Sequence, residues 1–352
     1  MNIVGLGLPF PAYSDPSIIG NRTPGDYWVW AVNAVLADGK FRAIFSMLFG
    51  ASVVLMAERA GRHGDAPWAA DCHLRRHLWL ILFGLVHAYV LIWPGEILFT
   101  YAIAGLPLFA FRRLRPRTLI IMGAIVLALQ APKMVLHNAQ VAEAAANVRA
   151  IDAAAAPLGA LTPAQDAARQ AAMNTLSGEK PTADALRTAI ESRRGSYIGS
   201  VAAAAGTNLY LQSTYLYKIG FWDAVGPMLI GMALVKRGVF SAARSNGFYL
   251  GMALAGYAVG LPLDIWMVAD WTRHGFAAGS RWVSLDEVTR MSIAFGHIAV
   301  VMRLCKLTTS RASRLMDPLA AAGRMALTNY VMQTVICVVI FSGLGFGWYG
   351  AL

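Results

Sequence analysis

The sequence predicts an all-α membrane protein built as a bundle of transmembrane helices. Of its 352 residues, 57% are hydrophobic and only 14% are charged, whereas a soluble domain carries about 25% charged residues. The mean hydropathy is +0.51. The apolar residues are gathered in runs that can cross a hydrocarbon core of about 30 Å as helices, and basic residues lie in the short segments between them. We expect about eight complete spans, preceded by a truncated first helix, in a single membrane domain.

The clearest element is a helical hairpin over residues 75–113. Two apolar runs, at about 77–93 and 96–111, are joined by a short turn at Pro94-Gly95. A pair of arginines lies at each end of the segment. Because arginine accumulates on the cytoplasmic face of a membrane, both ends of the hairpin are predicted to face the cytoplasm, with the turn on the opposite side.

The other complete spans are expected at 41–57, 118–136, 212–235, 246–268, 289–305 and 325–347. Residues 1–10 are apolar but too short to cross, so they are interpreted as the outer end of a helix whose beginning is missing. Residues 27–37 suit an interfacial helix, because tryptophan favours the headgroup level. Placing the four arginine-rich short loops inside predicts an exoplasmic C-terminus.

Residues 137–208 separate the N-terminal membrane helices, 1–136, from the C-terminal ones, 209–352. This segment is rich in alanine and is interrupted by Pro157, Pro163 and Pro181. Alanine favours helix, so we expect two or three short amphipathic helices in an exoplasmic insertion. The insertion is either a lid over an outward-facing cavity or a variable addition without that role.

Several classes of function are excluded or disfavoured. The net charge of +11 is explained by membrane orientation, so no nucleic-acid partner is expected. The three cysteines fall in different segments and indicate no disulfide framework. Cys72, His73 and His77 match no zinc pattern, so no metal site and no bound cofactor are predicted. The expected partner is the lipid bilayer of the bacterial inner membrane, while the oligomeric state is left open.

Ionisable side chains inside a bilayer are costly and therefore face a cavity or a partner. His87 lies roughly 9 Å inside the hairpin turn, and Tyr101 lies at a similar depth on the return helix. Glu96 lies at the turn itself. A histidine beside a carboxylate can act as a general base, so His87 and Glu96 are the candidate catalytic residues and Tyr101 a candidate substrate-binding residue. A structural histidine bonded to a neighbouring helix is the equal alternative.

Further polar groups lie at or near the outer half of the predicted bundle, where a hydrated vestibule or paired charges that fix helix packing would explain them. Asn329 and Gln333 are four residues apart and share a helix face; interhelical hydrogen bonding is the expected role for them, and substrate binding is the alternative. The candidate substrate-binding residues are, besides Tyr101, Lys40, Arg42, Asp223, His297, Asn329 and Gln333.

Three stretches resemble the YeiB-like bacterial membrane proteins, a family of unknown function (domain of unknown function 418). They are ADGKFRAIFSMLFGAS at 37–52, RRHLWLILFGLVHAYVLIWPGEILFTYAIAGL at 75–106 and GRMALTNYVMQT at 323–334. Glu96 stands where the family usually has aspartate. The usual N-terminal LRG helix start and C-terminal GPLEW motif are lacking, so we expect a fragment, a mis-started gene product or a protein that has lost activity.

The resemblance implies a distant relation to transmembrane acyltransferases. An acyl group would then pass from a cytoplasmic donor, such as acyl-CoA, to an exoplasmic acceptor, such as a sugar or another envelope component. In such a reaction a base deprotonates the acceptor or carries the acyl group itself. The alternatives are a proton-coupled transporter or exporter, suggested by Asp223 and His297 within spans, and a non-catalytic remnant of a membrane protein.

Overall fold

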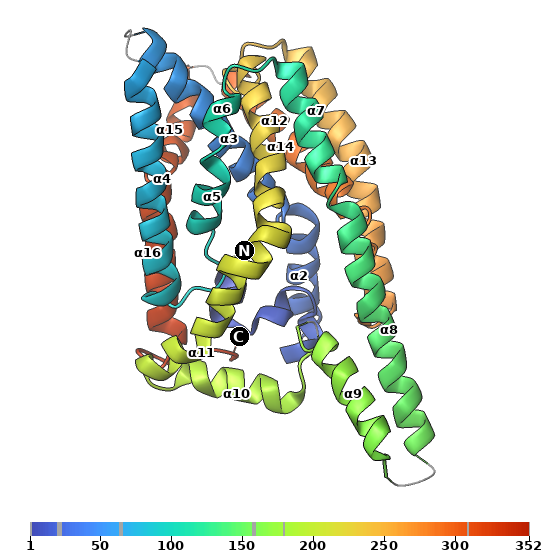
Figure 1. The fold of residues 1–352 in the computed structure, drawn as a ribbon. Helices are drawn as coiled ribbons and strands as arrows, with labels where there is room; N and C mark the ends of the chain where they lie inside the picture. The colour runs from blue at the N-terminus through green and yellow to red at the C-terminus, as the bar shows by residue number, and fades with distance from the viewer. Residues whose placement is uncertain are drawn as a thin grey trace.

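The structure is a computed structural model that describes residues 2–19, 23–62, 66–156, 160–178, 180–307 and 310–351, and these ranges contain helices and no strand. In chain order the elements are α1 (Asn2–Gly7), η1 (Phe10–Tyr13), η2 (Pro16–Ile19), α2 (Pro24–Leu36), α3 (Lys40–Arg62), α4 (Ala66–Tyr89), α5 (Leu98–Gly105), α6 (Leu108–Phe111), α7 (Pro116–Ala128), α8 (Ala131–Ala155), α9 (Pro163–Leu176), α10 (Ala183–Arg194), α11 (Tyr197–Tyr210), the π-helix η3 (Leu211–Gly220), α12 (Phe221–Lys236), α13 (Asn246–Arg273), α14 (Asp286–Leu307), α15 (Ser310–Arg324) and α16 (Ala326–Phe341). Figure 1 shows them as an elongated bundle.

The chain is a multipass membrane protein. In its described part, five helical stretches are long and apolar enough to cross a membrane: Pro24–Ala60, Pro116–Ala155, Tyr197–Lys236, Asn246–Arg273 and Asp286–Lys306. The number rises to six if Asp317–Arg324 and Ala326–Phe341, which meet at a bend of 78°, form one span. The expected count of eight complete spans is therefore not confirmed.

The hairpin accounts for part of this difference. α4 and α5 pack closely at Gly84, where an added side-chain carbon would lie 2.6 Å from the backbone nitrogen of Phe99. The return run, however, is divided into α5 and α6 by a turn at Leu106 and Pro107. Eight residues of α5 rise only about 12 Å, so this arm is too short to be a complete span by itself.

The two ends of the bundle differ in charge. The C-terminal end of α3 and the N-terminal end of α4 lie at the top of Figure 1, as do the α6–α7 and α12–α13 connections. These connections carry Arg112, Arg113, Arg115, Arg237 and Arg244. The α4–α5 turn, α9 and α10 lie toward the opposite end. We call the arginine-rich end the inner end and the opposite one the outer end, following the charge rule for membrane proteins.

The core is centred on α12, whose residues 224–234 are all buried. This helix packs against α3 so closely that a side-chain carbon added to Gly231 would overlap the Met47 carbonyl, and one added to Gly50 would overlap the Met228 carbonyl. Small residues permit such backbone contact between membrane helices. The contact fixes the register of α3 against α12, and thereby the position of the polar residues that follow α2.

The segment 137–208 is continuous with the membrane helices on both sides. α8 is a 25-residue helix that starts before it, and α11 runs through η3 into α12 as one helical stretch. α9 packs back on α8 through an apolar cluster of Val141, Ala144, Ala145, Ala172 and Leu176. Short helices are thus present, and Pro157 lies outside the described residues. The exoplasmic placement and the role of a lid remain predictions.

Candidate functional site: a charged cavity toward the outer end

The candidate site begins where α2 turns into α3. Gly39 ends the turn with a φ of +72°. This backbone conformation is readily adopted by glycine because it has no Cβ. Lys40 therefore enters the bundle as the first residue of α3. Its Nζ lies 2.5 Å from Asp264 Oδ2 and donates to the Ala34 carbonyl at 2.6 Å. The two charged side chains are only 7% and 8% exposed, so this ion pair joins α3 to α13 within the interior.

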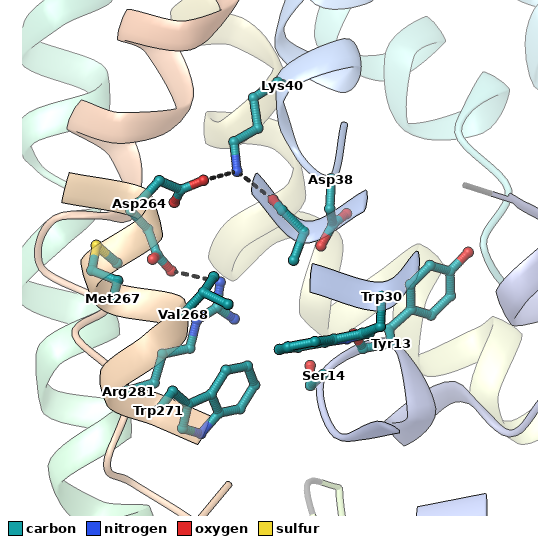
Figure 2. A pocket seen from close by; sticks show the side chains of 12 residues that line it. Tyr13, Ser14, Trp30, Asp38, Lys40, Asp264, Met267, Val268, Trp271 and Arg281 are labelled. Carbon is teal, nitrogen blue, oxygen red and sulfur yellow. Dashed lines mark hydrogen bonds and ion pairs between the residues drawn. The ribbon is translucent and has the colours of Figure 1, made fainter. Parts of the chain in front are cut away.

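A cavity opens beside this ion pair. It offers about 60 Å³ to the centres of water-sized molecules, which is room for a few waters. Figure 2 shows Lys40 and Asp264 on one side and the rings of Trp30, Trp271 and Tyr13 on another. The cavity is lined by Tyr13, Ser14, Trp30, Ala34, Asp38, Lys40, Asp264, Met267, Val268, Trp271, Arg281 and Asp286.

The aromatic wall is held from several elements. Trp30 Nε1 donates to the Tyr13 carbonyl at 2.9 Å, and the ring centroids of Trp30 and Trp271 are 6.2 Å apart. Burial raises the pKa of Tyr13 to about 12, so its hydroxyl keeps its proton at neutral pH. A second ion pair, between Arg281 and Asp286 at 3.2 Å, belongs to the polar side of the cavity.

A second set of charges lies next to the cavity, between α3, α12 and α14. Arg290 Nη1 lies 2.5 Å from Asp223 Oδ1, and its Nη2 lies 2.7 Å from Glu287 Oε2. Arg42 Nε approaches the other oxygen of Asp223 at 3.4 Å. Arg290 is only 8% exposed, but the Arg42 side chain is 45% exposed. Arg42 is therefore the more exposed cation of this set.

Tyr101 extends the polar set toward α5. Its hydroxyl is 2.6 Å from Ser46 Oγ and donates to the Arg42 carbonyl at 3.2 Å. Tyr215, on the π-helix η3, lies near Arg42, Asp223 and Arg290. π-Helical turns are often found at functional sites. The arrangement gathers polar groups from five elements at one depth, about 20 Å from the inner end of α12 by the helical rise.

Charges of opposite sign nearly balance across the cavity and the neighbouring set. The cations are Lys40, Arg42, Arg281 and Arg290; the anions are Asp38, Asp223, Asp264, Asp286 and Glu287. Asp38 makes no ion pair within the described part of the chain. A site of this kind has donors and acceptors on several sides and little excess charge. It therefore suits a ligand with many hydroxyl groups better than a simple anion.

Four of the residues that the sequence singled out meet here. Lys40 lines the cavity, and Arg42, Asp223 and Tyr101 form the adjoining set. His297 lies nearby on α14, where it is 2.8 Å from the Tyr257 hydroxyl and 2.8 Å from the Leu36 carbonyl. It holds the end of α2 but does not line the cavity. The binding roles of these residues remain predictions.

His87 and Glu96 lie in a different region, around the α4–α5 turn. His87 Nε2 is 2.8 Å from Thr334 Oγ1, and both side chains are buried. Glu96 accepts the backbone N–H groups of Leu98 and Phe99 and so caps α5. Tyr101, expected beside His87, points toward α3 instead. The two candidate catalytic groups thus do not line the cavity, and their chemical role remains a prediction.

The other predicted residues lie on α16. Asn329 Nδ2 donates to the Ala322 carbonyl at 3.1 Å across the α15–α16 bend, and Gln333 lies one turn further along α16. Neither lines the cavity. In the described residues no group of three or more His, Cys, Asp or Glu side chains is placed to hold a metal ion.

Sequence reasoning missed several site residues. Asp286 and Glu287 were assigned to a loop but form the first turn of α14, and Asp38 and Trp30 were not considered as ligands. Glu287 and Arg290 are three apart on a helix and can face one another. That spacing indicates a contact between Glu287 and Arg290. It does not indicate the contact of Arg290 with Asp223, which lies 67 residues earlier in the chain.

Comparisons with known proteins agree on one family. The model for "Protein of unknown function (DUF418)" matches residues 234–352. "Uncharacterized protein YeiB" of Escherichia coli is 27% identical over 365 residues, covering 98% of this chain and 80% of that protein. "Uncharacterized protein YxaH" of Bacillus subtilis is 27% identical over 312 residues, covering 87% of this chain and 67% of that protein. No solved structure matches.

Proposed function

We propose that this chain, which is similar to the YeiB-like proteins, binds one end of a hydroxyl-rich, sugar-like acceptor in the cavity toward its outer end. One observation carries this proposal: aromatic faces and paired charges line the same cavity. Binding sites commonly combine apolar and aromatic walls with a few convergent polar groups. A hydroxyl at the end of such an acceptor can contact Lys40, Asp264 or Asp38, while an adjoining apolar face can contact Trp30 or Trp271.

We place the protein in the bacterial inner membrane, with this cavity facing outward. The arginine-rich connections would then lie in the cytoplasm, as the charge rule requires. An acceptor from the envelope could enter from the outer end without crossing the bilayer.

The reaction that we propose is acyl transfer from a cytoplasmic donor such as acyl-CoA, which the resemblance to transmembrane acyltransferases implies. The acceptor hydroxyl attacks the thioester carbonyl, the C–S bond breaks, and the hydroxyl proton passes through a base to the leaving thiolate. Asp38 is the carboxylate of the cavity without an ion pair in the described residues, so it is the base to test for an acceptor held in the cavity.

Binding is tested first, without the reaction. Protein in lipid nanodiscs is titrated with methyl glycosides of glucose, N-acetylglucosamine and glucuronic acid, and the unfolding temperature is followed. We expect at least one glycoside to stabilise the wild type in a saturable way, with roughly tenfold weaker binding to Trp271→Ala. Trp79→Ala removes an exposed indole from α4 and serves as the matched control. Equal binding by all three proteins, or no binding at all, would contradict the proposal.

Transfer is tested with labelled acyl-CoA and a glycoside that binds. We expect label on the glycoside with the wild type, and a loss of about a hundredfold or more in Asp38→Asn, which lacks the base in the cavity; an equal loss in His87→Ala alone would assign the base to the α4–α5 turn instead. Saturable binding without any labelled product would support the proposed acceptor binding and contradict the proposed acyl transfer.

Proton-coupled transport is the second candidate, because the ion pairs Lys40–Asp264 and Arg290–Asp223 join helices across the bundle. Transporters often carry such ionisable groups within their membrane helices. In proteoliposomes the transport model expects glycoside uptake that responds to a pH gradient and is lost in Asp223→Asn. Uptake equal to that of empty liposomes would reject it.

A further inference from the structure

A second, smaller polar chamber lies at the α4–α5 turn, separate from the cavity described above. It is lined by Ala88, Pro94, Glu96, Thr100, Asn208, Leu211 and Gln212. It offers about 10 Å³ to the centres of water-sized molecules, which corresponds to a single water-sized occupant. Three elements meet around it: the end of α4, the turn with the start of α5, and the junction of α11 with the π-helix η3.

Asn208 indicates what the occupant must be. This side chain is only 2% exposed. Its Nδ2 donates to the Ala88 carbonyl at 2.7 Å, and this partner fixes the amide orientation because a flipped amide would set two oxygens against each other. Oδ1 then has no hydrogen-bond partner. A buried acceptor without a partner is costly. We therefore expect the chamber to hold a cation or a hydrogen-bond donor that contacts the Asn208 side-chain oxygen.

Glu96 supplies the charge. Its carboxylate accepts two backbone N–H groups from the start of α5, but no cation is paired with it within the described residues. Thr100 and Gln212, whose side chains carry neutral oxygens, line the same chamber. A single carboxylate surrounded by neutral oxygens matches a monovalent cation. Divalent cations in all-protein sites take six or more oxygens and usually several carboxylates.

The position of the chamber is also consistent with a site for a monovalent cation. Interrupted membrane helices use exposed carbonyls and helix ends to hold Na⁺ in transporters of known structure. Here the hairpin turn 90–97 places the ends of α4 and α5 beside the chamber, and η3 begins there at Leu211. We propose that Glu96, Asn208 and Thr100 form a binding site for a monovalent cation of the size of Na⁺, which ties the hairpin turn to η3.

The proposal does not depend on the acceptor cavity, so it is tested on the full chain in nanodiscs without glycoside. Binding of ²²Na⁺ is measured by scintillation proximity, and unfolding temperature is measured in NaCl against N-methylglucamine chloride at equal ionic strength. We expect saturable ²²Na⁺ binding, weaker competition by K⁺, and a higher unfolding temperature in Na⁺. Glu96→Gln keeps an oxygen for the α5 cap and should weaken Na⁺ binding at least tenfold.

Glu143→Gln, on an exposed position of α8, is the matched control and should bind Na⁺ like the wild type. Asn208→Asp adds a second carboxylate to the chamber, so Ca²⁺ should then stabilise the protein more than Na⁺ does. This variant keeps the test informative if Glu96→Gln fails to fold. Absence of saturable ²²Na⁺ binding, or unchanged binding in Glu96→Gln, would overturn the proposal and assign the chamber to a water molecule or a proton on Glu96.

Discussion

The cavity toward the outer end and the α4–α5 turn hold ionisable groups in opposite ways. Around the cavity, Lys40, Asp223 and Asp264 are matched by groups of opposite charge. At the turn, His87 contacts a threonine and Glu96 contacts backbone N–H groups. Paired charges hold helices in one arrangement, whereas an ionisable group with neutral partners can gain or lose charge or an ion without leaving an opposite charge unpaired.

This difference separates two tasks within one bundle. The charged cavity is suited to hold a ligand among fixed donors and acceptors. The turn is suited to respond to a cation or proton. If the difference is real, removing a charge should have unequal effects on stability in the two regions, and the effects should follow the burial of each pair.

The largest effect is expected for Lys40→Met. This change leaves Asp264 buried and without its cation, which typically costs about 3–5 kcal/mol. Unfolding by denaturant in detergent micelles measures the loss. The double variant Lys40→Met/Asp264→Leu replaces both partners by apolar groups and should recover most of the stability. If the double variant is as unstable as the single one, the pair does not hold α3 against α13 in the way we describe.

A smaller loss is expected for Asp223→Asn. It leaves Arg290 with Glu287 and leaves Arg42 partly exposed to solvent, so about 1.5–3 kcal/mol should be lost, the range for hydrogen bonds to charged groups. The same unfolding assay applies. Arg42→Gln should cost less than Asp223→Asn because of its exposure. The reverse order would mean that Arg42, rather than Arg290, is the main partner of Asp223.

At the turn, Thr334→Val should cost about 1–2 kcal/mol, because it removes the partner of a buried imidazole nitrogen while keeping the shape of the side chain. Val338→Thr on the same helix, four residues away, tests whether a hydroxyl alone changes stability. A loss in Thr334→Val as large as that in Lys40→Met would remove the contrast between the two regions.

The smallest effect is expected for Asn329→Ala. Its side chain is exposed and makes one bond to the Ala322 carbonyl, so the change in stability should stay within about 0.5 kcal/mol. Glycoside binding should be unchanged, since Asn329 does not line the cavity. Weaker glycoside binding by this variant would restore the substrate-binding role that its sequence position suggested.

Sequence reasoning succeeded where one helix or one loop carries the signal. The apolar runs and the arginine-rich connections predict the membrane bundle and the separation of its two ends, and Lys40, Arg42, Asp223 and Tyr101 stood out because polar side chains are rare in such runs. It was less successful where two segments must be compared. The hairpin predicted Tyr101 at the depth of His87, but the direction of the Tyr101 side chain depends on Ser46 of α3, and this contact points it away from His87.

The sequence by itself determined that this chain is a helical membrane protein similar to the YeiB-like proteins, because hydropathy, charge asymmetry and motif order are local properties. Only the tertiary structure decided the number of helices long enough to span and the groups that meet. Lys40 and Asp264 are 224 residues apart, and contact between side chains so distant in sequence depends on how closely α3, α12 and α13 approach. Glycines such as Gly50 and Gly231 set part of that approach, and no single segment encodes it.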